Sequence, residues 1–417
     1  MQSQAIIRKH RMDIRIILCM SILMLFGLIM IYQISPQYVH IMNELRGTDL
    51  HPQYIFTRQL INVALSLTAF IVLAKVIPYE LIKKSAPVVL IFGIVTCIVL
   101  AIAGALDLRI AQCSLGACRW INLGFVTFQP AELLKLGLVL YLAVLLGVAA
   151  REGNVNKSST LTRLAIITGI ALMFVVIIQR DLGTGVVIAC ITLAQMLISG
   201  INKKTLALII GAAVIAAMLF TVAVPHRRAR LMTFLKGDEA SISDDGSYHI
   251  VNAKIAIGSG GFFGVGIGNS VQSTGYLPES ISDSIFAIIG ETFGFIGLLI
   301  VIGLFAFLLW LLLRVTYYSH DPISQIISIG VFGWIAAHVF MNIAAMIGII
   351  PLTGITLPFL SSGGTSMIFI ATALGIVSQL SCYTSHTPAP SNASIESPSA
   401  IKRRTPVATT YRSQRKR

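Results

Sequence analysis

Ionisable side chains beside long apolar segments are costly and mark functional sites by default. The acidic ones are Glu279, Asp283 and Glu291, in the sequence YLPESISDSIFAIIGE, which opens such a segment. With Ser282 as the cap, Asp283 would lie in the first turn of a helix, where the dipole and free N–H groups keep a carboxylate ionised. It is then either a general base or a first-turn acid of the kind common in any helix.

A second group pairs an acid with a base. Pro130 suits the first turn of a helix, and Glu132 and Lys135 follow at a spacing that puts them on one helix face. They form either a structural ion pair, which lets two charges lie together in apolar surroundings, or a cavity wall. In the second interpretation Lys135 binds an anionic substrate and Glu132 holds Lys135. The two interpretations are compatible.

Two glycine-rich segments are candidates for a binding surface. Residues 258–268 suit turns or a close approach of the backbone, but match a nucleotide-binding loop poorly because no GK[ST] follows. Residues 348–367 interrupt an apolar run with prolines and glycines, and irregular backbone at membrane depth needs burial by protein or a wet cavity. Hydroxyls such as Ser361 and Thr365 would suit a cavity wall, and a structural re-entrant turn fits equally well.

Two other patterns have structural interpretations. Asp181, in the segment QRDLGT, is predicted to cap the following helix, and no chemistry is assigned to it. Cys113 and Cys118 share one loop, where their spacing permits a disulfide without requiring one. The six cysteines include no CxxC pair and the histidines do not cluster, so no zinc site is predicted.

The elements that must position these residues are membrane helices. Of 417 residues, 56% are hydrophobic and 12% are charged, about half the charged share of a soluble protein. This composition excludes a disordered chain, a disulfide-rich secreted domain and an ordinary soluble enzyme, and continuous apolar runs argue against a β-barrel. Since a span needs roughly 20 apolar residues, we expect spans near 15–33, 58–75, 86–106, 131–149, 164–179, 183–199, 205–224, 284–314, 325–349 and 364–381.

The charge distribution orients these spans. Roughly two thirds of the 31 Lys and Arg residues lie on the side that holds the two termini, which the positive-inside rule assigns to the cytoplasm. We therefore predict an all-α polytopic membrane protein with about ten transmembrane helices and both termini cytoplasmic. Its parts are an N-terminus over 1–14, a membrane domain over 15–382 with a large extracytoplasmic loop over 225–283 between helices seven and eight, and a disordered basic cytoplasmic tail over 383–417.

The net charge of +14 does not require nucleic acid. The basic residues predicted on the extracytoplasmic side are more numerous than the positive-inside rule favours, so they are candidates for binding an external anion. They include Arg119 and a loop cluster of Arg227, Arg228 and Arg230.

Taken together, these motifs resemble those of the SEDS family of cell-wall polymerases, whose named types are FtsW, RodA and SpoVE. The resemblance covers about residues 10–382, and GIGNS followed by YLPE is more similar to the division type, FtsW. The matching segments are ACRWI with FQPAELLKL, QRDLGT, RRARL, IAIGSGGFFGVG, YLPESISDSIFAIIGE and LPFLSSGGTS.

The resemblance implies a peptidoglycan glycosyltransferase of the bacterial inner membrane that polymerises lipid II on the extracytoplasmic side. The family's essential aspartate falls on Asp283, as general base on the acceptor hydroxyl, with undecaprenyl pyrophosphate leaving. No dedicated cofactor or metal is implied, although a pyrophosphate can recruit a divalent cation. The family implicates three binding positions, Arg119, Glu132 and Lys135. Charge, the predicted membrane side or hydroxyl chemistry adds the other candidates, which are Arg227, Arg228, the family-like Arg230, Glu279, Glu291, Ser361 and Thr365.

The resemblance also implies a partner, a single-span class B penicillin-binding protein with transpeptidase activity, within a division or elongation complex. The alternatives are a lipid II flippase or transporter and a non-enzymatic scaffold for the transpeptidase. The polymerase is favoured because neither alternative explains an aspartate on the outer side. The chain departs from the family motifs where proline, glutamine, phenylalanine, glutamate and tyrosine are usual, at Arg180, His249, Ser284, Thr292 and Ser362.

Overall fold

The computed structural model describes residues 11–114, 117–122, 124, 127–223, 228 and 245–384. Within these ranges, nine helices are long and apolar enough to cross a membrane. They are α1 (Ile14–Arg46), α2 (Tyr54–Ile71) continued by a π-helix (Val72–Val76), α3 (Tyr79–Ala105), α4 (Pro130–Arg151), α5 (Ser158–Leu172) continued by a π-helix (Met173–Ile178), α6 (Leu182–Ser199), α10 (Ile285–Tyr318), α11 (Pro322–Met346) and α12 (Thr365–Leu380) with its short extension to Tyr383.

The predicted spans are recovered as helices, and most of them begin earlier than the apolar runs alone suggest. The helix α7 (Lys203–Ala223) lies at the predicted seventh span. The total of ten spans stays a prediction, as does the cytoplasmic side of the termini. The predicted basic tail lies almost wholly outside the described residues.

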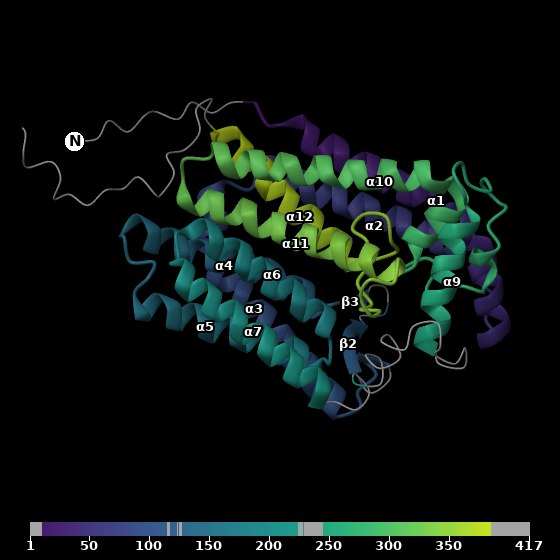
Figure 1. The fold of residues 1–417 in the computed structure, drawn as a ribbon, viewed down its shortest axis with the longest axis horizontal. Helices are drawn as coiled ribbons and strands as arrows, with labels where there is room; N and C mark the ends of the chain where they lie inside the picture. The colour runs from purple at the N-terminus through teal and green to yellow at the C-terminus, as the bar shows by residue number, and fades with distance from the viewer. Residues whose placement is uncertain are drawn as a thin grey trace, which may run out of the picture.

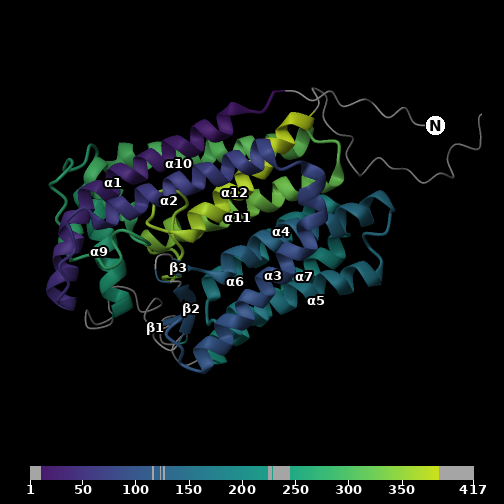
Figure 2. The same cartoon turned by 180° about the vertical axis from the view of Figure 1, so that it is seen from behind.

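The helices form one bundle with two sides. Figures 1 and 2 show α1, α2, α10, α11 and α12 on one side and α3 to α7 on the other. The helices α4, α11 and α12 are the most buried of the nine spans, and α11 contacts α4, α6, α10 and α12. Glu132 and Lys135 on α4 and His338 and Asn342 on α11 are enclosed by protein.

The described chain begins and ends at the same end of the bundle. The backbone N–H of Asp13, which caps α1, donates to the hydroxyl of Ser381 at 2.9 Å. The opposite end is where α10 begins and α11 ends, and we call it the site end (Figure 1).

The site end carries elements that the all-α prediction omitted. A three-stranded antiparallel sheet, β1 (Ala111–Ser114), β2 (Ala117–Asn122) and β3 (Thr127–Phe128), lies between α3 and α4. The region predicted as a large loop contains the helix α9 (Asp245–Ser259). The all-α prediction is therefore wrong in detail, because strands this short have no apolar run or alternation long enough to stand out.

The helix α10 is broken at Gly294, where φ is 65° and ψ is −161°. The break frees the carbonyls of Glu291 and Thr292, which accept from the N–H groups of Val265 and Gly266 at 2.9 and 3.0 Å. The next two free N–H groups of the helix donate to loop carbonyls at 3.0 and 3.3 Å. The loop 258–268 thus replaces the hydrogen bonds that the helix loses, as an apolar environment demands.

A pair of glycine substitutions tests this fit. In Gly264→Ala the new Cβ would lie 2.2 Å from the carbonyl oxygen of Thr292, whereas Gly268 has nothing within 4 Å. Both positions have a positive φ, +84° and +89°, so both variants bear the same backbone cost. We expect Gly264→Ala to destabilise the protein by at least about 2 kcal/mol, and Gly268→Ala by clearly less.

Thermal unfolding of both variants in detergent, followed by circular dichroism, measures the difference. Equal midpoints for the two variants would show that the loop does not pack against α10 in this way.

Candidate active site

Asp283 lies in a tight turn that precedes α10. The N–H groups of Ser282 and Ser284 both donate to the carbonyl of Glu279, at 3.0 and 3.1 Å, and Glu279 has a φ of 49°. The helix begins at Ile285, and the hydroxyl of Ser282 bonds to the Glu279 carboxylate at 2.6 Å. The predictions that Ser282 caps the helix and that Asp283 lies in its first turn are therefore wrong, because the turn forms first.

Polar groups of α11 and of the segment 347–364 hold this turn in place. The amide of Asn342 donates to the carbonyl of Asp283 at 2.7 Å and to that of Ile355 at 2.8 Å. The hydroxyl of Ser361 donates to the carbonyl of Ser282 at 2.6 Å. Ser361, predicted as a cavity hydroxyl, is buried and supports the backbone beside Asp283. The interrupted segment is thus packed protein that positions the acidic turn.

The environment of Asp283 disfavours its charge. Its side chain is only partly exposed. Burial, and after it the negative charges of Glu279 and Asp181, raise its pKa from the ordinary 3.8 to about 7 against the opposing positive charge of Arg119. The expectation that the helix dipole keeps this carboxylate ionised left out its burial, which is the main cause of the raised pKa. A carboxylate poised near neutral pH is suited to accept and release a proton.

Arg119 acts on Asp283 through its charge from β2. Its guanidinium donates to the backbone carbonyls of Gln179 at 3.4 Å and Arg180 at 3.0 Å. The next residue, Asp181, caps α6 by accepting from the N–H and hydroxyl of Thr184 at 3.0 and 2.9 Å, as predicted. Its charge also acts on Asp283, which the prediction of a cap alone did not include.

The predicted pair of Glu132 and Lys135 is present and fully enclosed. Their charged atoms lie 2.8 Å apart, with side-chain exposures of 4% and 0%. Lys135 also lies 3.1 Å from Nε2 of His338, which accepts from the indole of Trp334 at 3.3 Å. The Nδ1 atom of this histidine faces the carbonyl of Thr356 at 3.2 Å. Because a carbonyl can only accept, the proton is on Nδ1, and the ring is neutral.

This arrangement connects the ion pair to the segment beside Asp283. Lys135 lies deep in the bundle, and the His338 ring bridges it to the backbone of residue 356. The second carboxylate oxygen of Glu132 is buried and has no partner among the described residues. Lys135 therefore supports the site through His338, and the geometry does not place it against Asp283.

The other predicted residues lie on separate parts of the chain. Glu291 is buried, and its carboxylate accepts from the hydroxyl of Ser270 and from the N–H groups of residues 271 and 272, so it holds a turn. Thr365 begins α12 and accepts from the N–H of Gln129 at 3.3 Å. Arg228 is exposed. The predicted Arg227 and Arg230 lie outside the described residues.

Asn342 and His338 were missed by the sequence interpretation. Both are polar residues inside a predicted span, and an intramembrane polar residue is a usual signal of function. Among the described residues, no group of three or more His, Cys, Asp or Glu side chains is placed to hold a metal ion.

A family model described as "Cell cycle protein", FtsW/RodA/SpoVE, matches residues 13–386. The chain belongs to the FtsW/RodA/SpoVE family. Among its relatives is a "Probable peptidoglycan glycosyltransferase FtsW" of Bacillus subtilis, 28% identical over 384 residues, covering 90% of this chain and 92% of the relative. Another, with the same name, from Aliivibrio salmonicida, is 32% identical over 359 residues and covers 85% of each chain.

A solved structure shares the fold of this FtsW/RodA/SpoVE chain. It is described as "Structural coordination of polymerization and crosslinking by a peptidoglycan synthase complex". The similarity has a TM-score of 0.70 at 21% identity and covers 89% of this chain and 97% of the other.

Two departures from the FtsW/RodA/SpoVE motifs contact each other beside Asp283. The hydroxyl of Ser284 donates to the carbonyl of Pro278 at 2.8 Å, so it accepts from the Nε2–H of His249 on α9. The two positions are 35 residues apart in the chain, and a single sequence does not show that they meet.

The raised pKa of Asp283 predicts a stabilising substitution. The folded protein holds this proton up to about pH 7, while the unfolded chain releases it near the ordinary 3.8. Stability is therefore lost as the pH rises between these values, and the loss is complete above 7. We expect Asp283→Asn, which is never charged, to unfold at a higher temperature than the wild type at pH 8, and the advantage to vanish below pH 4. Melting curves at both pH values measure this, and a lower midpoint at pH 8 would contradict it.

Proposed function

We propose that this chain is a peptidoglycan glycosyltransferase that polymerises lipid II, with Asp283 as the general base. The observation that carries this proposal is the partly exposed carboxylate of Asp283 at one end of a membrane bundle, in a turn held by Asn342 and Ser361 and acted on by the positive charge of Arg119. The relatives' names and the family support the activity.

The reaction needs one base and one anion-binding group. Asp283 accepts the proton of the acceptor sugar hydroxyl, and the oxygen forms a bond to the anomeric carbon of the donor. The bond from that carbon to the pyrophosphate oxygen breaks, and undecaprenyl pyrophosphate leaves with the electron pair. A guanidinium beside it stabilises this developing charge, because its N–H groups match phosphate oxygens.

Arg119 is the described cation best placed for that role. Two of its N–H groups are used by backbone carbonyls, which orient the guanidinium and leave further donors for an anion. We assign substrate binding also to Glu279, beside the base, and to Arg227, Arg228 and Arg230. Glu132, Lys135, Glu291, Ser361 and Thr365 act instead as supports, since each is buried and hydrogen-bonded within the protein.

The setting of the enzyme follows from the same proposal. We place the protein in the bacterial inner membrane, with the site end on the extracytoplasmic side, where lipid II is used. A class B penicillin-binding protein is the proposed partner. The solved structure with the same fold, which is described as a peptidoglycan synthase complex, supports this proposal. The FtsW names of the relatives favour cell division over elongation.

The first test is polymerisation of lipid II by purified protein in detergent, where no translocation is needed, so a flippase or scaffold would make no glycan. We expect Asp283→Asn to lower the rate by about 10²–10⁴-fold. Asp49→Asn is the matched control, because Asp49 is an exposed carboxylate between α1 and α2. Glycan formation by Asp283→Asn at the wild-type rate would remove the role of Asp283.

The second test is the pH dependence of the same assay. Only ionised Asp283 can accept a proton, so the rate should rise with pH and level off above about 7. Glu279→Gln removes a negative charge that raises this pKa, so the rising limb should move to lower pH. An unchanged limb in this variant would mean that another group controls the rate.

A further inference from the structure

We propose that the disulfide between Cys113 and Cys118 is a positioning element that holds Arg119 at the active site. The inference rests on the proposed function, because it concerns the anion-binding side chain of that site. Cys118 lies in the family-like segment ACRWI beside Arg119, Cys113 lies outside these segments, and the sequence left open whether the two are joined.

The disulfide closes the β1–β2 hairpin. Cys113 and Cys118 are register partners with Cα atoms 4.0 Å apart. The bond also seats the hairpin on the end of α3, since a Cβ on Gly104 would lie 2.7 Å from the sulfur of Cys118. The disulfide therefore joins the two strands covalently, and its Cys118 sulfur packs against Gly104 of α3, which leaves no room for a larger residue there.

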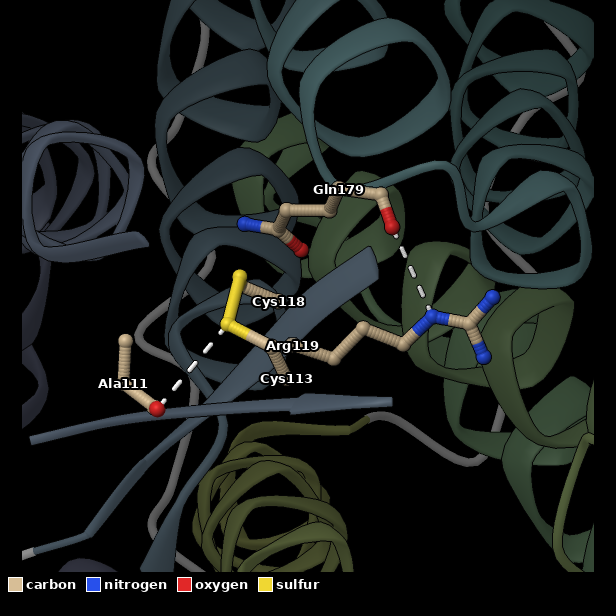
Figure 3. Close-up of a disulfide and its surroundings, with 5 residues drawn as sticks. All are labelled: Ala111, Cys113, Cys118, Arg119 and Gln179. Atoms are coloured by element: carbon tan, nitrogen blue, oxygen red, sulfur yellow. Dashed lines mark hydrogen bonds between the residues drawn. A yellow bond between two sulfur atoms is a disulfide. The ribbon is translucent and has the colours of Figure 1, made fainter. Parts of the chain in front are cut away.

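Arg119 follows directly in β2. Successive side chains of a strand point to opposite faces, so a strand seated on α3 through Cys118 must direct Arg119 away from α3. Figure 3 shows this side chain leading away from the disulfide toward the carbonyl of Gln179. The direction of Arg119 is thus set by the residue before it.

The far end of Arg119 ties down the turn before α6. This turn has a left-handed residue, Arg180, with a φ of 53°, whose carbonyl accepts from the guanidinium. The side chain of Gln179 lies 3.4 Å from the sulfur of Cys97 on α3, so α3 supports both ends of the contact. The cap residue Asp181 follows, and the hairpin therefore positions two charges that act on Asp283 in opposite directions.

The hairpin needs this cross-link. A two-stranded hairpin is marginally stable alone, and β3 adds only two residues to it. A free arginine side chain also loses much conformational freedom when it is held in one direction. The disulfide fixes the backbone from which Arg119 extends, so less backbone freedom is lost when the guanidinium binds an anion, without a new contact to the ligand.

The experiment compares oxidised with reduced protein. An added dithiol supplies two electrons and two protons, so that the protein disulfide becomes two thiols and the dithiol becomes a disulfide. The Cys113→Ser/Cys118→Ser variant gives the same state without reductant, and Cys190→Ser is the control for loss of a thiol elsewhere. Circular dichroism of each sample, taken well below its melting temperature, compares the helical bundles.

Two readouts report on Arg119 specifically. Affinity for undecaprenyl pyrophosphate should fall about 10-fold without the disulfide, as for a weakened charge-assisted hydrogen bond. The rising limb of the polymerisation rate should move to higher pH than the wild-type value near 7, since Arg119 lowers the pKa of Asp283. In an Arg119→Gln background, loss of the disulfide should change neither quantity further.

Two outcomes overturn the inference. In the first, reduced and oxidised protein have the same affinity for undecaprenyl pyrophosphate and the same pH dependence of the rate, while Arg119→Gln changes both quantities. The disulfide would then only stabilise the hairpin. If Arg119→Gln changes neither, Arg119 is not what the disulfide positions. If the oxidised wild type makes no glycan, the proposed function fails, and the affinity comparison still decides the role of the disulfide.

Discussion

Backbone polar groups inside an apolar bundle must be hydrogen-bonded by the protein, and this requirement determines where Asp283 lies. The loop 258–268 supplies the hydrogen bonds that α10 loses where it breaks at Gly294. Asn342 and Ser361 hydrogen-bond the interrupted segment 347–364 to the turn that carries Asp283. The irregular backbone of these two segments is therefore a hydrogen-bonded support for the site.

The charges of the site are balanced at two depths. Near the site end, Asp283 lies among two negative charges and the positive charge of Arg119, and burial keeps its pKa near 7. Deeper in the bundle, Lys135 and Glu132 neutralise each other, and a neutral His338 connects them to residue 356. The first group suits proton transfer, and the second gives a buried, hydrogen-bonded anchor for the segment above it.

Much of this could be predicted from local sequence. Apolar length located the spans, the i, i+3 spacing of Glu132 and Lys135 predicted their ion pair, and Asp181 was recognised as a cap. The sheet, the start of α10 and the partners of Asp283 could not be predicted. They depend on contacts between segments far apart in the chain, such as Asn342 with Asp283, which no local pattern records.

The most direct test of the central claim is a cryo-electron microscopy structure of Asp283→Asn with lipid II in the acceptor and donor positions. We expect the acceptor hydroxyl within hydrogen-bond reach of residue 283, about 2.6–3.2 Å, and the donor pyrophosphate against the guanidinium of Arg119. An acceptor hydroxyl bound away from residue 283, with another side chain beside it, would contradict the assignment of Asp283 as the base.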